Sequence, residues 1–252
     1  DLAEFLDGSE QGAIFFSLGS NIKSELLAKE RLDMLISSFA ALGPKIRVLW
    51  KFNPKTPIDN LPSNLLIRKW LPQEDILGHP KLLLFITHGG ALSTQEAIHH
   101  GIPMVGMPFF ADQHTNVRRM VELKVSREVS ILTATKESFM KTILSVINDP
   151  SYRQNMQRLS KLFRDQPQTP RERAVFWTEF LLRHGEGRIE SLRSPGLDLT
   201  WYQYFLLDVL AVLLSCILMI IIIIIVIICS MYKIFKRMLN PSKSSKESKK
   251  RR

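Results

Sequence analysis

The sequence predicts an α/β fold, with a doubly wound parallel sheet covered by helices on both faces, followed by one transmembrane helix near the C-terminus. Short, wholly apolar segments alternate with amphipathic helical segments from residue 12 to residue 184. Strands that are apolar throughout are typical of parallel sheets buried on both faces. A separate uncharged stretch at residues 209–232 is long enough to cross a bilayer.

Most strands are predicted from short runs of mainly apolar residues bounded by glycine, proline or polar residues. In chain order, these runs are residues 12–18, 45–52, 65–69, 82–87 and 102–107, and a further strand is predicted near residues 126–129. The stretch 53–64 carries three prolines and is predicted to be a loop. None of the longer runs alternates between apolar and polar residues, which favours parallel pairing in the middle of a sheet.

Each helix is predicted from apolar residues spaced three and four apart. The predicted helices are residues 24–42, 73–78, 91–100, 115–123, 136–147, 151–164 and 170–184. Gly43 and Pro44 end the first of them, as expected for a helix terminus. The regular alternation of strand and helix predicts a Rossmann-like domain over residues 1–184, and the polar stretch 185–204 is predicted to be a juxtamembrane linker.

The charge of the chain is concentrated in its last residues. Of the formal net charge of +10, residues 232–252 contribute +8, from nine Lys and Arg residues against Glu247. The rest of the chain carries only +2, so the basic composition does not indicate a positively charged binding face. Nucleic acid is therefore not predicted as a partner.

Residues 209–232 predict a membrane span, placed at 205–232 with its flanks. They carry no charge and include an almost pure isoleucine run at 219–228. The alternative, a buried core helix, would not be this long and apolar on all sides. The basic tail, residues 233–252, follows directly, so the positive-inside rule predicts a single-pass protein with a cytosolic C-terminus and a luminal or external domain.

The last four residues, 249–252 (KKRR), place lysines third and fourth from the C-terminus. This position is typical of a dilysine signal for the endoplasmic reticulum membrane, and the alternative is a solvated tail attracted to anionic lipid. Both cysteines, Cys216 and Cys229, lie in the predicted span, so no disulfide and no cysteine-based metal site is expected in the luminal part. No signal peptide follows Asp1, and the chain is expected to be the C-terminal part of a longer precursor.

Polar residues gather where three predicted strands end, and ligands of open α/β sheets bind at such ends. Residues 16–20 offer hydroxyls and a glycine for close backbone approach, and residues 108–113 end on an acid and an amide. Residues 86–90 form a strand-to-helix turn whose free N–H groups suit a phosphate. The dinucleotide fingerprint and the P-loop pattern are absent, so an NAD or ATP site is not favoured. The candidates at these ends are Ser17, Gly19, Ser20, His88, Gly89, Gly90, Asp112 and Gln113.

Each candidate also has a plainer interpretation. A lone histidine such as His88 is usually structural, and two glycines suit any tight turn. Trp70 could be a core aromatic, Glu96 could lie on a solvated helix face, and Asp112 with Gln113 could cap the helix that follows. Their joint occurrence within 44 residues, from Trp70 to Gln113, favours a single ligand site.

Residues 70–113 open with Trp-Leu-Pro-Gln, pass through His-Gly-Gly and close on Asp-Gln. The segment resembles the signature of the UDP-glycosyltransferase family, of the glucuronosyl- and glucosyltransferase type. The resemblance extends to residues 16–20, 148–150 and 173–177 and continues through the span and the tail, so it covers essentially the whole chain. The sequence of residues 88–113 is most similar to that of insect-type members. The resemblance implies the C-terminal domain of a GT-B glycosyltransferase, with UDP-sugar as co-substrate and no metal or other cofactor.

The resemblance also implies the nucleoside contacts. Trp70 would stack on uracil, the backbone of Leu71 would pair with its edge, and Gln73 and Glu96 would bind the ribose hydroxyls. Amide and carboxylate groups suit a diol of this kind.

The diphosphate contacts that the resemblance implies are Ser20, His88, Ser93 and the backbone of Gly90. One position departs from the family, because vertebrate and plant members commonly have asparagine where this chain has Leu92. Phosphate binding is therefore expected to depend more on Ser93, His88 and backbone N–H groups.

The resemblance assigns Asp112 and Gln113 to hydroxyls of the transferred sugar. Insect-type members favour glucose. Glucuronate would need a cation near these two residues, and Arg118 and Arg119 are near in sequence.

The family uses an inverting mechanism in which a histidine, oriented by an aspartate, deprotonates the acceptor as UDP leaves. Those two residues belong to the N-terminal domain, so no residue of this chain is assigned a catalytic role, including His88, His99 and His100. The chain alone is expected to bind the donor and to transfer little or no sugar.

Three functions compete. The leading hypothesis is the donor-binding half of a membrane-anchored transferase that glycosylates small lipophilic acceptors, as in detoxification, from UDP-glucose or UDP-glucuronate. The second is a non-catalytic membrane subunit that associates with full-length enzymes through the helices after residue 151 or the span, as a homo- or hetero-oligomer. The third, a membrane-tethered scaffold, predicts no UDP binding.

Overall fold

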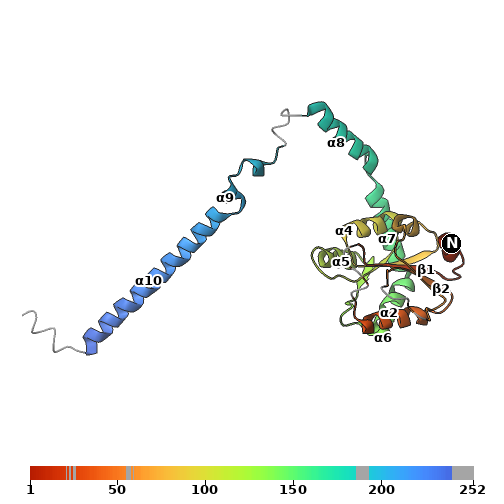
Figure 1. The fold of residues 1–252 in the computed structure, drawn as a ribbon, viewed down its shortest axis with the longest axis horizontal. Helices are drawn as coiled ribbons and strands as arrows, with labels where there is room; N and C mark the ends of the chain where they lie inside the picture. Colours follow the sequence, from red (N-terminus) through yellow and green to blue (C-terminus); the bar gives the residue numbers. More distant parts are fainter. Residues whose placement is uncertain are drawn as a thin grey trace, which may run out of the picture. The chain divides into compact units, whose positions relative to one another are not determined.

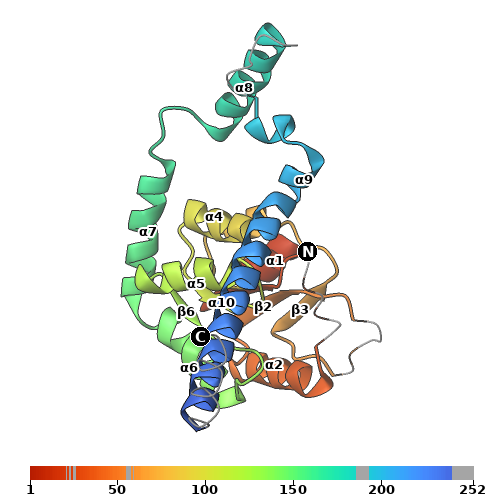
Figure 2. The same ribbon diagram turned by 90° about the vertical axis from the view of Figure 1, so that its left-hand side faces the viewer.

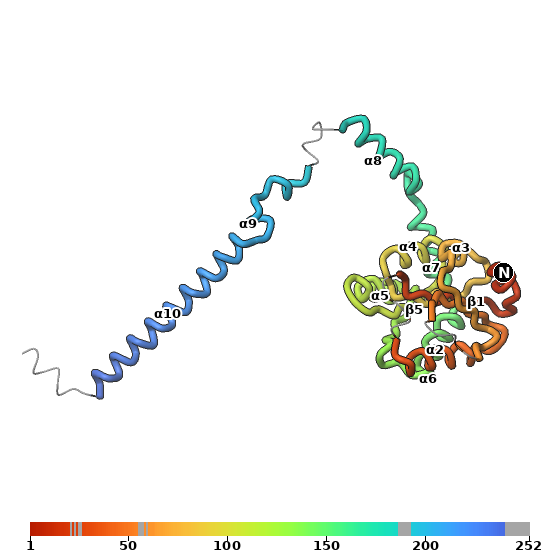
Figure 3. The backbone as a smooth tube through the Cα atoms, viewed as in Figure 1, coloured from red at the N-terminus to blue at the C-terminus, as the bar shows by residue number. Residues whose placement is uncertain are grey.

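A computed structural model describes residues 1–20, 22, 24, 27–54, 58, 60–185 and 193–239. The chain divides into two compact units, Asp1–Thr169 and Pro170–Arg252, which are treated separately below (Figures 1 and 3). The domain boundary that the sequence places near residue 184 stays a prediction. The dilysine motif at residues 249–252 lies outside the described residues.

The first unit is built on a sheet of six parallel strands in the order β3-β2-β1-β4-β5-β6. The strands are β1 (Gly12–Ser17), β2 (Ile46–Lys51), β3 (Leu65–Arg68), β4 (Leu82–Thr87), β5 (Met104–Gly106) and β6 (Ser126–Glu128). This order runs outward in both directions from the β1–β4 pair, so the predicted doubly wound parallel sheet is confirmed. Every residue of β1 is buried, as a strand covered on both faces requires.

Helices cover both faces of the sheet (Figure 2). They are α1 (Leu2–Asp7), α2 (Lys29–Ala41), α3 (Gln73–Leu77), α4 (Ala91–His100), α5 (Gln113–Glu122), α6 (Lys136–Ile147) and α7 (Pro150–Arg164). Ile14 and Phe16 of β1 pack in one apolar cluster with residues of α2 and α6. Ala13 and Phe15 pack in a second cluster with residues of the other helices. The side-chain alternation of one strand therefore supplies both halves of the core.

Two helix starts differ from the sequence prediction. Helix α2 begins at Lys29, not at residue 24, because Ala28 has an extended backbone (ψ 147°) and the apolar side chains of Ile22 and Leu27 pack against the core. The helix propensity of residues 24–42 does not indicate that the helix begins only at Lys29. Helix α1, with one buried residue, Leu6, was not predicted because six residues are too few to show a helical period.

The sheet order creates a crevice at the carboxyl ends of β1 and β4. The chain leaves β1 toward α2 on one face of the sheet, and it leaves β4 toward α4 on the opposite face. Where neighbouring strands send their connections to opposite faces, the loops separate and leave room for a ligand. The predicted site segments 16–20 and 86–90 lie at this point.

The second unit contains α8 (Pro170–His184), a short 3-10 helix (Pro195–Asp198), α9 (Trp201–Tyr204) and α10 (Leu207–Leu239). Helix α10 is long and apolar enough to cross a membrane by length and composition. Its 33 residues span about 50 Å, more than the roughly 30 Å of a bilayer core. The helix continues past residue 232, where the sequence ended the span, because the basic residues of the last turn, Lys236 and Arg237, are favourable at a helix C-terminus.

Candidate functional site

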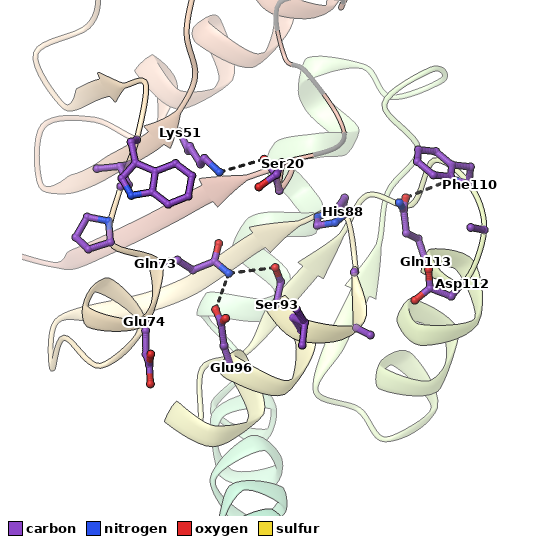
Figure 4. Close-up of a pocket in the computed structure, with 18 residues that line it drawn as sticks. Ser20, Lys51, Gln73, Glu74, His88, Ser93, Glu96, Phe110, Asp112 and Gln113 are labelled. Carbon is purple, nitrogen blue, oxygen red and sulfur yellow. Dashed lines mark hydrogen bonds between the residues drawn. The ribbon is translucent and has the colours of Figure 1, made fainter. Parts of the chain in front are cut away.

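A cavity of about 740 Å³ lies at the carboxyl ends of β1 to β5 (Figure 4). Of the residues predicted from sequence, it is lined by Gly19, Ser20, Trp70, Leu71, Gln73, His88, Gly90, Ser93, Glu96, Asp112 and Gln113. Ser17 and Gly89 do not line it. Ser17 is fully buried at the end of β1, where its Oγ accepts a hydrogen bond from the Gly19 N–H at 3.3 Å. The volume is typical of a pocket for a small organic ligand.

Trp70, just after β3, presents its indole to the cavity. Its side chain is 72% exposed, whereas the neighbouring Leu71 is 2% exposed and anchors the segment in the core. Trp70 is therefore not a core aromatic. An exposed ring held by a buried neighbour offers a flat surface on which a planar base can stack.

A polar network joins α3 to α4 at the floor of the cavity. The amide nitrogen of Gln73 donates to Oε2 of Glu96 at 2.6 Å and lies 3.1 Å from Oγ of Ser93. Glu96 is half-buried, whereas its neighbour Gln95 is exposed, so Glu96 does not lie on the solvated face of α4. The network holds a carboxylate and a hydroxyl in place for a ligand with adjacent hydroxyl groups.

The turn after β4 leaves room for the imidazole of His88 by using glycines. A Cβ on Gly19 would lie 2.5 Å from Cε1 of His88, and one on Gly90 would lie 2.5 Å from Nε2. Gly89 has φ +79°, and a Cβ there would lie 2.3 Å from Cγ2 of Val117 on α5. The Gly-Gly pair therefore does more than form a tight turn, because it lets His88 and the start of α4 approach each other.

His88 lies beside the N-terminus of α4, in surroundings that favour its neutral imidazole. Burial lowers the pKa of its imidazole, Asp112 partly offsets that effect, and Lys51 lowers the pKa further. No side chain caps the N-terminus of α4 at Gly90 within the described residues. The free N–H groups of this first turn and the positive end of the helix dipole suit a phosphate.

The loop after β5 carries the acid–amide pair. Oε1 of Gln113 accepts hydrogen bonds from the N–H groups of Phe109 at 2.9 Å and Phe110 at 3.2 Å, which leaves its NH₂ group for a ligand. The carboxylate of Asp112 accepts from Nδ2 of Asn116 at 2.7 Å. Asp112 precedes α5 directly, but its side chain does not cap the helix. Its carboxylate is positioned for hydroxyl groups at this end of the cavity.

Several lining residues were not predicted from the sequence. They are Lys51, Pro72, Glu74, Ala91, Leu92, Phe110 and Ala111. Lys51 is the most informative, because it is the last residue of β2 and thus lies at the same edge of the sheet as the other strand ends. Its position at the end of a predicted strand could have identified Lys51 as a site residue from the sequence. The side chain of Leu92 is 74% exposed in the first turn of α4, where it brings no polar group to the cavity.

Metal ligation has no support from clustered side chains. Among the described residues, no group of three or more His, Cys, Asp or Glu side chains could hold a metal ion. The expected absence of a cofactor stays a prediction.

Comparisons with known proteins point to one family. The model of a family described as "UDP-glucoronosyl and UDP-glucosyl transferase" matches residues 1–243. The chain is 46% identical over 218 residues to UDP-glucuronosyltransferase 2B15 of Homo sapiens, covering 86% of this chain and 40% of that protein. It is 41% identical over 245 residues to UDP-glucuronosyltransferase 2B17 of Mus musculus, covering 97% of this chain and 45% of that protein. The chain thus spans less than half the length of these relatives. Both are mammalian, so the insect-type likeness of residues 88–113 stays a prediction.

Solved structures resemble a large part of the chain. The crystal structure of Os79 from O. sativa in complex with UDP has a TM-score of 0.62 at 24% identity, covering 73% of this chain and 43% of that one. The glycotransferase of kitacinnamycin has a TM-score of 0.60 at 25% identity, covering 68% and 44%. This likeness supports the predicted GT-B type of fold.

Proposed function

The chain belongs to the UDP-glucoronosyl and UDP-glucosyl transferase family of glycosyltransferases, and from that premise we propose that its first unit binds the UDP-sugar donor. One observation carries the proposal. The cavity has an exposed aromatic ring beside Lys51. Figure 4 shows, across the pocket from Lys51, the Gln73–Glu96 pair, then Ser93 and His88 at the uncapped N-terminus of α4, and then the Asp112–Gln113 pair. The donor has its base, ribose, diphosphate and sugar in the same order. Trp70 would mark the base end, Glu96 the ribose, and Asp112 the sugar end.

We propose a neutral hexose as the transferred sugar, with glucose favoured. Asp112 gives its end of the cavity a negative charge, and Lys51 is the one cationic side chain among the described lining residues. Lys51 and Asp112 lie on opposite sides of His88 (Figure 4). Arg118 and Arg119 do not line the cavity, and Arg119 lies 3.5 Å from Glu122. A glucuronate carboxylate would meet Asp112 without a compensating cation, although the mammalian relatives are named for glucuronate.

The chemical step is proposed to need more than these 252 residues. In the inverting mechanism, a histidine–aspartate pair deprotonates a small lipophilic acceptor, which attacks the anomeric carbon as UDP leaves. We propose that this pair lies in a part of the protein outside the 252-residue chain, which spans 40% of a relative such as the human 2B15 enzyme. Residues 1–252 alone are then expected to bind the donor and to transfer little or no sugar. Clear turnover of UDP-glucose onto a phenol would contradict this.

Helix α10 is proposed to anchor the protein in the endoplasmic reticulum membrane, with the donor-binding unit in the lumen and the basic tail in the cytosol. Its length, its uncharged stretch and the position of the basic residues support this orientation. Protease protection in microsomes tests it, because only the tail should be digested while the vesicles are intact.

Calorimetric titration of the full chain in lipid nanodiscs tests donor binding. We expect UDP and UDP-glucose to bind, UDP-glucose to bind at least as tightly as UDP-glucuronate, and His88→Ala to weaken all three. Circular dichroism of the variant checks that it is folded. A folded wild-type chain that binds no UDP would reject the donor site, and tighter binding of UDP-glucuronate would reject the neutral hexose.

Donor binding is expected to depend on pH through His88. Burial lowers the pKa of the free imidazole from its ordinary value, which favours the neutral ring before the donor binds. A diphosphate beside the ring stabilises the imidazolium and raises its pKa, so binding takes up a proton. Affinity for UDP-glucose should therefore rise as the pH falls through the pKa of His88 in the complex, and it should level off below the lowered pKa of the free imidazole. The total gain is about tenfold for each unit by which binding raises the pKa.

UDP-glucose suits this measurement because its diphosphate has no terminal phosphate group that titrates near pH 6. His88→Gln keeps a polar side chain that does not titrate and serves as the control. An equal pH dependence in the wild type and in this variant would assign the effect to another group.

A further inference from the structure

The ammonium group of Lys51 lies between Gly19 and Trp70, which both line the cavity. Its Nζ donates to the backbone carbonyl of Gly19 at 3.3 Å and lies 4.4 Å above the centre of the Trp70 ring. The ammonium therefore covers part of one face of the indole, the ring on which the proposed function stacks uracil. A base cannot stack on that face while the ammonium group remains over it.

The same ammonium lies close to the proposed phosphate position. Lys51 hydrogen-bonds Gly19, and an ideal Cβ on Gly19 would be 2.5 Å from the His88 ring. His88 in turn adjoins Gly90 at the start of α4. Figure 4 shows Lys51 directed toward the loop at Ser20, with His88 beyond it. A lysine side chain is long and flexible, so a small rotation can carry its charge from the indole toward this helix terminus.

Lys51 has no carboxylate partner where it lies. No ion pair joins it to an acidic residue in the part of the chain that the structure describes, and burial lowers the pKa of its amine. The carboxylates of the cavity belong to Glu74, Glu96 and Asp112, and burial lowers the pKa of the His88 imidazole, which disfavours its charged form. A bound diphosphate would therefore find one full positive charge among the described lining residues, and Lys51 would gain the counter-ion that it lacks.

We propose that Lys51 is a mobile ligand of the donor diphosphate, which rests on Trp70 in the free protein and moves to the phosphates when uracil takes its place. The proposal deepens the donor-binding function and depends on it. Lys51 then acts in two opposite ways. It competes with the base for the indole, and it attracts the diphosphate, so only nucleotides that carry phosphate gain from displacing it.

The test compares UDP with uridine, which has the same base and ribose but no phosphate. Both are titrated by calorimetry into the full chain in nanodiscs, as wild type, Lys51→Met and Lys51→Arg. We expect Lys51→Met to weaken UDP binding by about tenfold to 100-fold and to strengthen uridine binding by about twofold to fivefold. Lys51→Arg, which keeps the charge, should retain UDP binding within about threefold of the wild type.

Lys45→Met is the matched control. Lys45 precedes the other end of β2, is exposed and pairs with Glu10 at 3.4 Å, so its loss changes the net charge equally but away from the cavity. It should leave both affinities unchanged.

The opposite signs for the two ligands separate this role from a structural one. If Lys51 only supported the loop at Gly19, its loss would weaken the binding of UDP and of uridine alike. That result would overturn the proposal. Unchanged UDP affinity in Lys51→Met would overturn it as well. A wild-type chain that binds neither ligand would instead remove the donor-binding function on which the proposal rests.

Discussion

Replacing Trp70 with alanine is expected to weaken UDP binding by roughly fivefold to 150-fold, because base–aromatic stacking contributes about 1–3 kcal/mol. The indole is 72% exposed and contributes little to the core, so the free energy of unfolding should change by less than about 0.5 kcal/mol. Trp70→Phe keeps an aromatic face and should recover most of the affinity. Titration of the three proteins with UDP measures the effect.

Trp177→Ala is the control for Trp70. Trp177 is 51% exposed on α8, in the second unit of the chain, and its loss should not change UDP affinity. Equal losses in the two alanine variants would mean that the indole of Trp70 does not form the base platform. Trp70→Ala also provides a second check on Lys51, since removing the indole should abolish the gain in uridine affinity expected from Lys51→Met.

Gly89→Ala should produce the largest loss of stability among the substitutions considered, about 2–5 kcal/mol. The left-handed backbone at φ +79° costs an alanine about 1–2 kcal/mol. Its Cβ would also lie 2.3 Å from Cγ2 of Val117 and 3.3 Å from the backbone oxygen of Gln113, and such overpacking adds about 1–3 kcal/mol. UDP binding should fall too, because the turn holds His88 against the start of α4.

Gly43→Ala separates the two costs of Gly89→Ala. Gly43 has a similar backbone, φ +76°, but a Cβ there meets nothing within 4 Å, so only the conformational cost of about 1–2 kcal/mol is expected. Pulse proteolysis in urea reads the population of the unfolded first unit and is not dominated by the apolar helix α10. Equal losses in the two variants would show that the contact with Val117 is relieved without cost.

Much of the fold follows from local sequence. The six strands of the sheet were predicted at their correct places, and the first five are short, mainly apolar runs whose neighbours in the chain define their ends. The boundaries were less certain where packing decides them. Residues 24–28 have good helix propensity, yet the chain stays extended at Ala28 and α2 begins at Lys29. Side chains that pack on a distant strand outweigh propensity there.

The features of the site also divide into those that the local sequence predicts and those that only packing decides. The motif residues of 70–113 could be named from sequence, because their types and spacing are local properties. Whether Trp70 faces the solvent or the core was undecided, since both are compatible with the sequence, and the buried Leu71 beside it resolves the matter. The sequence also could not predict that Oε1 of Gln113 accepts hydrogen bonds from the N–H groups of Phe109 and Phe110. These bonds depend on the conformation of the loop after β5.

The sequence by itself determined the class of sheet, the apolar helix near the C-terminus and most of the residues around the cavity. Each of these depends on periodicity, composition or motif spacing along a continuous stretch. Only the tertiary structure placed Lys51 over Trp70, because β2 and the segment after β3 become neighbours through strand order. The lowered pKa of His88 was decided there too, since the burial that lowers it, and the opposing effects of Asp112 and Lys51, come from segments far apart in the chain.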